Sequence, residues 1–175
     1  MEHPVDLLSR LDARGRSAAA VLPERAKVKR QWVGVAFRVA GQHFVAPLAH
    51  VRETVNFPAL TRVPATRDWF LGVTNLRGVL LPIVDLQIFA GGRPTVVGRR
   101  SHVLVIEHGG VHAGLLVVEV GGVRRFTEDQ VVGAPTGSHR LDKFVLARVR
   151  DDEREWRVFS TQALAADGGF LRAAL

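Results

Sequence analysis

The sequence contains no cysteine and no tyrosine. The lack of cysteine excludes disulfides, thiolate nucleophiles and cysteine-ligated metal sites, and the lack of tyrosine removes one class of acid–base catalyst. No apolar run approaches the roughly 20 residues that a membrane-spanning helix needs. Charged residues interrupt the leucines of the N-terminal segment, so a secretory signal is not expected either. These absences predict a cytoplasmic protein that is not inserted into a membrane.

Motifs that carry catalysis are also missing. His108 and His112 stand four positions apart, but the glycine pair between them predicts a hairpin turn, which does not align two metal ligands as a helix would. Ser101 and Ser138 each precede a histidine, yet a nucleophilic serine needs its base held across space by a third group. The sequence has neither a nucleophile elbow nor a glycine-rich phosphate loop. We therefore expect no enzyme, no cofactor and no metal, with an enzyme of unrecognised site as a remaining alternative.

The charge balance is basic. Lysine and arginine number 24 against 17 aspartate and glutamate residues, which gives a formal net charge of +7. Such a balance favours anionic partners, but the basic residues are scattered in pairs, which is typical of a solvated surface. The aromatics Phe37, Phe44, Phe57 and Trp69 fall among apolar strand positions or beside prolines, which indicates core rather than base stacking. Nucleic acid is thus an unfavoured partner, and a basic small-barrel nucleic-acid-binding protein is kept as the alternative function.

Residues 1–31 differ from the rest of the chain. Leu7, Leu11 and Leu22 recur at close to helical spacing, and Pro23 ends the pattern. We expect an N-terminal arm with one helix and a charged linker over 1–31. Both a docking peptide and a frayed tail fit this pattern.

The remainder predicts β-hairpins. Segments rich in β-branched and aromatic residues alternate with glycine turns, as antiparallel strands require. The expected hairpins join residues 32–39 to 44–48, 70–76 to 79–84, 102–107 to 113–120, and 144–149 to 156–159. With 175 residues, 47% of them hydrophobic, the chain is long enough to bury a substantial core. The repeated order indicates an internal duplication and a mainly β fold of two small barrels with about five strands each.

Asp85 stands between the expected strand 79–84 and a short apolar segment. This position suits a helix N-cap, and the glycine pair at 91–92 suits the stop that follows. A phospho-acceptor aspartate is the competing interpretation. It needs an early acidic pair and a late lysine on a doubly wound sheet, and that pattern is missing, so the cap is favoured.

The run at residues 71–86 closely resembles the signature of CheW-like domains. It reads Leu-Gly-Val-Thr-Asn-Leu-Arg-Gly-Val-Leu-Leu-Pro-Ile-Val-Asp-Leu, and residues 51–53, 60–64 and 114–117 resemble that family at matching separations. The resemblance spans about residues 32–165. It implies a CheW-like fold in which two five-stranded SH3-like β-barrels pack around a shared hydrophobic core, with an N-terminal helical arm and short helices. The CheW-like domain of two interleaved lobes is then expected over residues 32–170.

The resemblance also implies a function. CheW-like adaptors bind the C-terminal CheW-like regulatory domain of a CheA-type histidine kinase and the cytoplasmic tip of a methyl-accepting chemoreceptor. The expected function is therefore a non-enzymatic scaffold recruited to membrane-associated receptor arrays. Within the family, the N-terminal arm and residues 31–38 and 43–48 resemble the members that serve type IV pilus (twitching motility) signalling.

By resemblance, eight residues belong to the receptor groove between the lobes. They are Val51, Glu53, Arg62, Gly72, Asn75, Leu76, Arg77 and Gly78. Arg77 at a hairpin tip suits forked bonds to carboxylates, and Gly72 leaves room for a partner helix. The competing interpretations are that Gly72 relieves crowding and that Val51 belongs to the core. For Glu53 they are a capping role or a surface pair with Arg52 or Arg62.

Overall fold

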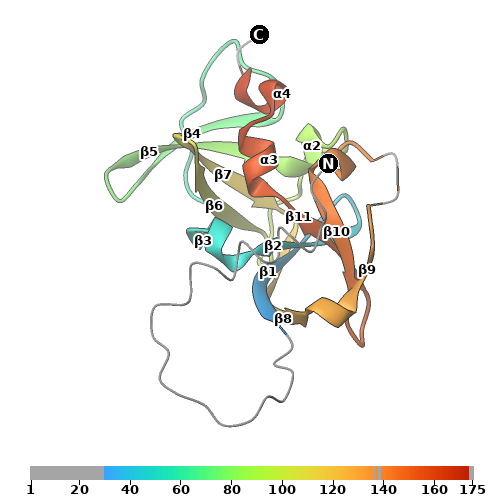
Figure 1. The fold of residues 1–175 in the computed structure, drawn as a ribbon. Coiled ribbons are helices and arrows are strands. Elements are labelled where there is room, and N and C mark those ends of the chain that lie inside the picture. The colour runs from blue at the N-terminus through green and yellow to red at the C-terminus, as the bar shows by residue number, and fades with distance from the viewer. Residues whose placement is uncertain (1–29, 136, 138, 174–175) are drawn as a thin grey trace.

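The computed structural model describes residues 30–135, 137 and 139–173, and these residues form two curled β-sheets (Figure 1). The first sheet has the order β8-β1-β2-β11-β10-β9. Its strands are β1 (Gln31–Val39), β2 (Gln42–Pro47), β8 (Glu119–Thr127), β9 (Val131–Gly133), β10 (Val145–Arg150) and β11 (Glu155–Phe159). The expected arm lies almost entirely outside the described residues.

The second sheet has the order β3-β6-β7-β5-β4. Its strands are β3 (Glu53–Asn56), β4 (Phe70–Leu76), β5 (Val79–Asp85), β6 (His102–His108) and β7 (Val111–Val117). The helical elements are short: η1 (Leu48–His50), α2 (Leu86–Phe89), η2 (Glu128–Gln130), η3 (Asp142–Phe144), α3 (Thr161–Ala165) and α4 (Gly168–Leu171). None of the helices in the described part of the chain is long and apolar enough to cross a membrane.

Each sheet takes one main hairpin from each half of the chain. The first combines β1–β2 with β10–β11, and the second combines β4–β5 with β6–β7. In both sheets the two hairpins join through parallel pairing of their return strands, β2 with β11 and β5 with β7. The expected mainly β fold is therefore confirmed, and it is built as two curled sheets.

The expected strand count is corrected in the first sheet, which has six strands rather than five. The predicted return strand 113–120 ends as β7 at Val117, and β8 begins two residues later. At this break the N–H of Val118 donates to the carbonyl of Arg38 at 3.1 Å, so the chain crosses to the other sheet. Strand β8 is not predicted from the sequence, because glycines and paired arginines interrupt its apolar pattern.

The core continues between the sheets. Phe37 and Phe44 of the first sheet belong to the same buried cluster as Leu104 and Leu115 of the second. Phe37 and Phe44 stack with ring centroids 5.5 Å apart, and each meets the ring of Phe159 edge-on. Burying such a side chain contributes roughly 1.5–3 kcal/mol, so this shared cluster stabilises the packing of one sheet on the other.

Asp85 caps helix α2, as predicted. Its Oδ1 accepts from the backbone N–H of Gln87 at 2.9 Å and of Ile88 at 3.3 Å. Thr95 donates its own N–H to Oδ2 and its hydroxyl to Oδ1, both at 2.8 Å. The carboxylate is buried, which fits a structural cap and leaves no exposed oxygen for phosphorylation.

Candidate protein-docking site

The β4–β5 hairpin projects beyond the rest of its sheet and ends in a tight turn (Figure 1). Arg77 has φ +52° and Gly78 has φ +86°, and two positive φ values are the mark of the type I′ turn that matches strand twist. The Oδ1 of Asn75 accepts from the N–H of Gly78 at 2.8 Å. Three of the predicted groove residues therefore build one rigid turn that presents the Arg77 side chain.

Arg77 forms a forked ion pair with Glu53 of β3. Its Nη2 lies 3.0 Å from Oε2, and its Nη1 donates to Oε1 at 3.2 Å. The Arg77 side chain is 77% exposed, whereas that of Glu53 is 22% exposed. Since β3 and β4 are opposite edges of the second sheet, this pair forms across the curl of the sheet.

The surface pairing considered for Glu53 therefore exists, but with a distant partner. Its neighbour Arg52 is ion-paired with Glu107 instead. Proximity in the sequence predicts a nearby arginine as the partner of Glu53. The curl of the sheet instead brings Arg77 to it.

Gly72 is required by a close approach within the chain itself. A Cβ at this position would collide with the carbonyl oxygen of Thr61, and the residue has φ +141°. Thr61 and Val73 exchange backbone hydrogen bonds of 2.8 and 2.9 Å beside it. The space left by the missing side chain is filled by the segment at Thr61 and Arg62, so crowding explains the glycine.

The other predicted groove residues differ in exposure. Val51 is buried in the shared core at 8% exposure and offers little side-chain area to a partner. Leu76 is half-buried against the second-sheet cluster. Arg62 is exposed and lines a groove of about 520 Å³ together with residues of β4 such as Phe70.

Sequence reasoning missed two apolar side chains beside this turn. Val79 is 48% exposed and Leu80 is 65% exposed, whereas Leu81 next to them is fully buried. The all-apolar run of β5 gave no alternation from which the exposed face could be read. We call Glu53, Arg77, Val79 and Leu80 the hairpin surface: an apolar tip with a charged pair beside it, the composition typical of a protein contact.

The histidines and serines considered for catalysis lie in strand pairs, are buried, or fall outside the described residues. His112 pairs across β6–β7 with Glu107, and His108 pairs with Val111. In the part of the chain that the structure describes, no group of three or more histidine, aspartate or glutamate residues is placed to hold a metal. Ser101 is buried, and Ser138 lies outside the described residues.

Three of the four aromatics considered for base stacking lie inside the protein. Phe37, Phe44 and Trp69 are at most 7% exposed, and Phe57 is half-buried against the second-sheet cluster. A small barrel that binds nucleic acid strands presents aromatic rings on its surface. Phe37, Phe44 and Trp69 are therefore not placed for that task.

Comparison with known proteins identifies the family to which this chain belongs. The sequence model of the CheW-like domain matches residues 33–168. The chain belongs to the CheW-like domain family. It is 39% identical to protein PilI of Pseudomonas aeruginosa over 176 aligned positions, which cover 100% of this chain and 98% of the relative. It is 30% identical to a probable chemotaxis protein CheW of Rhizobium etli, over 76% of this chain and 86% of the relative.

A solved structure shares the CheW-like fold. The crystal structure of the scaffolding protein TtCheW from Thermoanaerobacter tengcongensis superposes with a TM-score of 0.69 at 24% identity, covering 79% of this chain and 94% of that one. The sequence match and the structural match therefore agree on a CheW-like domain with a CheW-like fold.

Proposed function

We propose that this CheW-like protein is a non-catalytic adaptor that couples a CheA-type histidine kinase to methyl-accepting chemoreceptors in type IV pilus (twitching motility) signalling. The observation that carries the proposal is the 39% identity to PilI, which runs through the whole chain and so includes the residues before the CheW-like domain. The pilus assignment follows the resemblance of those residues to that branch of the family.

The hairpin surface is the proposed receptor contact. A receptor tip is a helical structure, and an amphipathic helix docks by laying apolar side chains into a complementary surface. Leu80 and Val79 supply exposed apolar area, and Arg77 supplies a guanidinium that is 77% exposed although it already holds Glu53. An acidic receptor residue would share or displace the carboxylate of Glu53, which gives the contact its charge specificity.

The kinase contact is proposed to be a pairing of like domains. The C-terminal regulatory domain of a CheA-type kinase has the CheW-like fold itself, so two barrels meet. In this proposal the adaptor acts in the cytoplasm at receptor arrays, and its output is the proximity of kinase and receptor rather than a chemical step.

The proposal is tested by pulldown of the full chain against a receptor tip fragment and the kinase regulatory domain. Arg77→Glu is expected to weaken receptor binding at least tenfold, about 1.4 kcal/mol, and to leave kinase binding unchanged. Arg150→Glu is a matched control, because Arg150 is a similarly exposed arginine that is paired with Glu155 on the other sheet.

A charge-swapped variant separates direct from indirect action of Arg77. Glu53→Arg combined with Arg77→Glu restores an opposite-charge pair in reverse order. If Arg77 itself contacts the receptor, the double variant stays weak; if Arg77 only holds the hairpin, binding returns. Failure of the wild-type chain to bind either partner at moderate salt would contradict the adaptor function, and DNA would be the next partner to test.

A further inference from the structure

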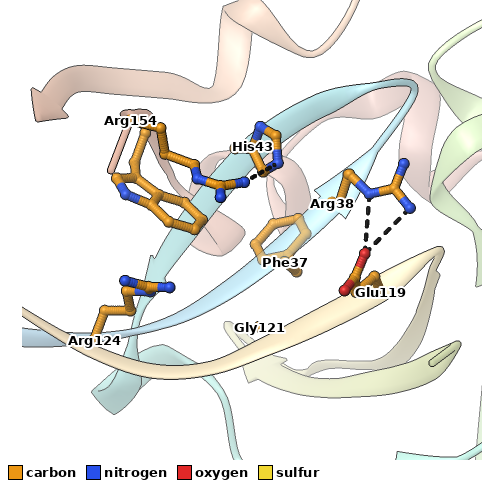
Figure 2. A pocket seen from close by; sticks show the side chains of 8 residues that line it. Phe37, Arg38, His43, Glu119, Gly121, Arg124 and Arg154 are labelled. Atoms are coloured by element: carbon orange, nitrogen blue, oxygen red, sulfur yellow. Dashed lines mark hydrogen bonds and ion pairs between the residues drawn. The ribbon is translucent and has the colours of Figure 1, made fainter. Parts of the chain in front are cut away.

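The first sheet bears a small pocket that the proposed function does not use. Its volume is about 150 Å³, and it is lined from β1, β2, β8 and the β10–β11 hairpin (Figure 2). The lining residues are Phe37, Arg38, His43, Glu119, Gly121, Arg124, Arg154 and Trp156. Three arginines against one carboxylate give this lining an excess of positive charge.

Two of the arginines are held by the indole of Trp156. The Cζ of Arg124 lies 5.0 Å from the ring centroid, and that of Arg154 lies 5.6 Å from it. The indole is fixed in turn, because its Nε1–H donates to Asp151 at 2.7 Å. Cation–π contacts of this kind are attractive, and they order the guanidinium groups before any ligand arrives.

His43 lines the pocket beside Arg154. Its Nε2 lies 2.8 Å from Nη1 of Arg154, and Figure 2 shows the two groups facing each other. A guanidinium only donates, so Nε2 must accept and the ring is neutral with its proton on Nδ1. Burial, and then the charges of Arg154 and Arg38, hold the pKa of His43 below its ordinary value, while Glu119 acts in the opposite direction.

The carboxylates near the pocket already have partners. Glu119 accepts from Arg38 at 3.2 Å and lies 3.4 Å from Arg100. Arg124 pairs with two acids that do not line the pocket, Asp151 at 3.4 Å and Glu153 at 3.0 Å.

The contact between Arg154 and His43 changes character when the ring is protonated. Nε2 then becomes a donor, and two cationic donors face each other with no acceptor between them. Glu153 lies 3.8 Å from Arg154, farther than the 3.0 Å that separates it from Arg124. An oxyanion that accepts from both groups would remove this conflict.

We propose that this pocket binds one oxyanion, the carboxylate or sulfate-like group of a small anion or of an acidic partner side chain, between Arg154 and His43. Binding is coupled to proton uptake by His43, since the anion supplies the acceptor that the imidazolium needs. The coupling is reciprocal: the anion raises the pKa of His43, and acidification strengthens anion binding. One unit of pKa shift corresponds to about a tenfold change in anion affinity.

The test follows the His43 ring proton by NMR between about pH 5 and 8 in the full chain. Sulfate is the tetrahedral probe and acetate is the carboxylate probe, each compared with chloride at equal ionic strength. His43→Gln identifies the signal. We expect one or both anions, but not chloride, to raise the pKa of His43 by about one unit. A stronger response to acetate indicates an acidic side chain as the natural ligand, and a stronger response to sulfate indicates a free dianion.

Two variants make the test decisive. Arg154→Gln is expected to abolish the anion response, and circular dichroism checks that the fold is retained. Arg52→Gln is the matched control, because it removes an exposed, ion-paired arginine on the other sheet and should respond like the wild type. A His43 titration that neither anion moves overturns the proposal, and so does an equal response in Arg154→Gln. Neither result depends on receptor or kinase binding.

Discussion

The hairpin surface of the second sheet and the oxyanion pocket of the first differ in how their residues come together. Arg77, Val79 and Leu80 are neighbours in one hairpin, and Glu53 is 24 positions away from Arg77. His43 and Arg154 are 111 positions apart and meet only because β2 and β11 pair in parallel. The turn that carries Arg77 could be located in the sequence, whereas a contact that depends on sheet pairing needs the folded molecule.

The largest expected effect concerns the base of the hairpin. Gly72→Ala should destabilise the protein by about 2–3 kcal/mol, because the new Cβ meets Thr61 and the backbone φ is positive. Gly78→Ala is the matched control: its φ is also positive but nothing lies within 4 Å, so about 1 kcal/mol is expected. Urea unfolding measures both. Equal losses would show that crowding is not what selects Gly72.

A binding effect of intermediate size is expected at the tip. Leu80→Ser should weaken receptor-tip binding about tenfold, or about 1.4 kcal/mol, because the side chain is 65% exposed and available to a partner. The free energy of unfolding should change by less than about 0.5 kcal/mol. Val123→Ser removes an apolar side chain that is 61% exposed on the first sheet and should leave receptor affinity unchanged. An equal loss of receptor affinity in the two variants would contradict a receptor contact on the second sheet alone.

A smaller effect is expected for the ion pair of the hairpin surface. A double-mutant cycle of Glu53→Ala and Arg77→Ala should give a coupling energy of about 0.5 kcal/mol, because Arg77 is mostly in water. Calorimetric unfolding at low and high salt measures it, and salt should reduce it. A coupling of several kcal/mol would mean that the pair holds the sheet closed rather than presenting a surface.

The smallest expected effect is on folding stability at low pH. It concerns Asp151, in the loop that carries Arg154. Burial alone raises the pKa of Asp151, but hydrogen bonds from Arg154, Trp156 and Glu153 outweigh it and leave the pKa below its ordinary 3.8. A depressed pKa in the folded state contributes stability above pH 3.8 that is lost as the pH falls further. Asp151→Asn should flatten the loss of stability below this pH in acid unfolding curves, and unchanged curves would contradict it.

Much of the second sheet could be predicted from local sequence. The hairpin at 70–84 and the cap at Asp85 depend on residues that are close in the chain, and both are present. The pairing of Glu53 with Arg77 could not be predicted, because it depends on how far the sheet curls. The exposure of Leu80 was hidden for a different reason: an all-apolar strand carries no alternation to mark its outer end.

The first sheet was harder to predict for reasons that its residues make plain. Strand β8 carries Gly121, Gly122 and paired arginines where a strand pattern normally shows alternating apolar residues. Its partner is β1, nearly ninety positions earlier, as the pairing of Arg38 with Glu119 illustrates at a separation of 81. Because the pocket depends on that same pairing, it was also absent from the sequence-based hypotheses.

In the proposed function, one chain holds kinase and receptor at the same time. The most direct measurement mixes the full chain with the kinase regulatory domain and a receptor tip fragment and follows co-elution in size-exclusion chromatography. The account predicts a single ternary peak with the wild type and a binary kinase complex with Arg77→Glu. Binding of each partner only in the absence of the other, or of neither, would contradict it.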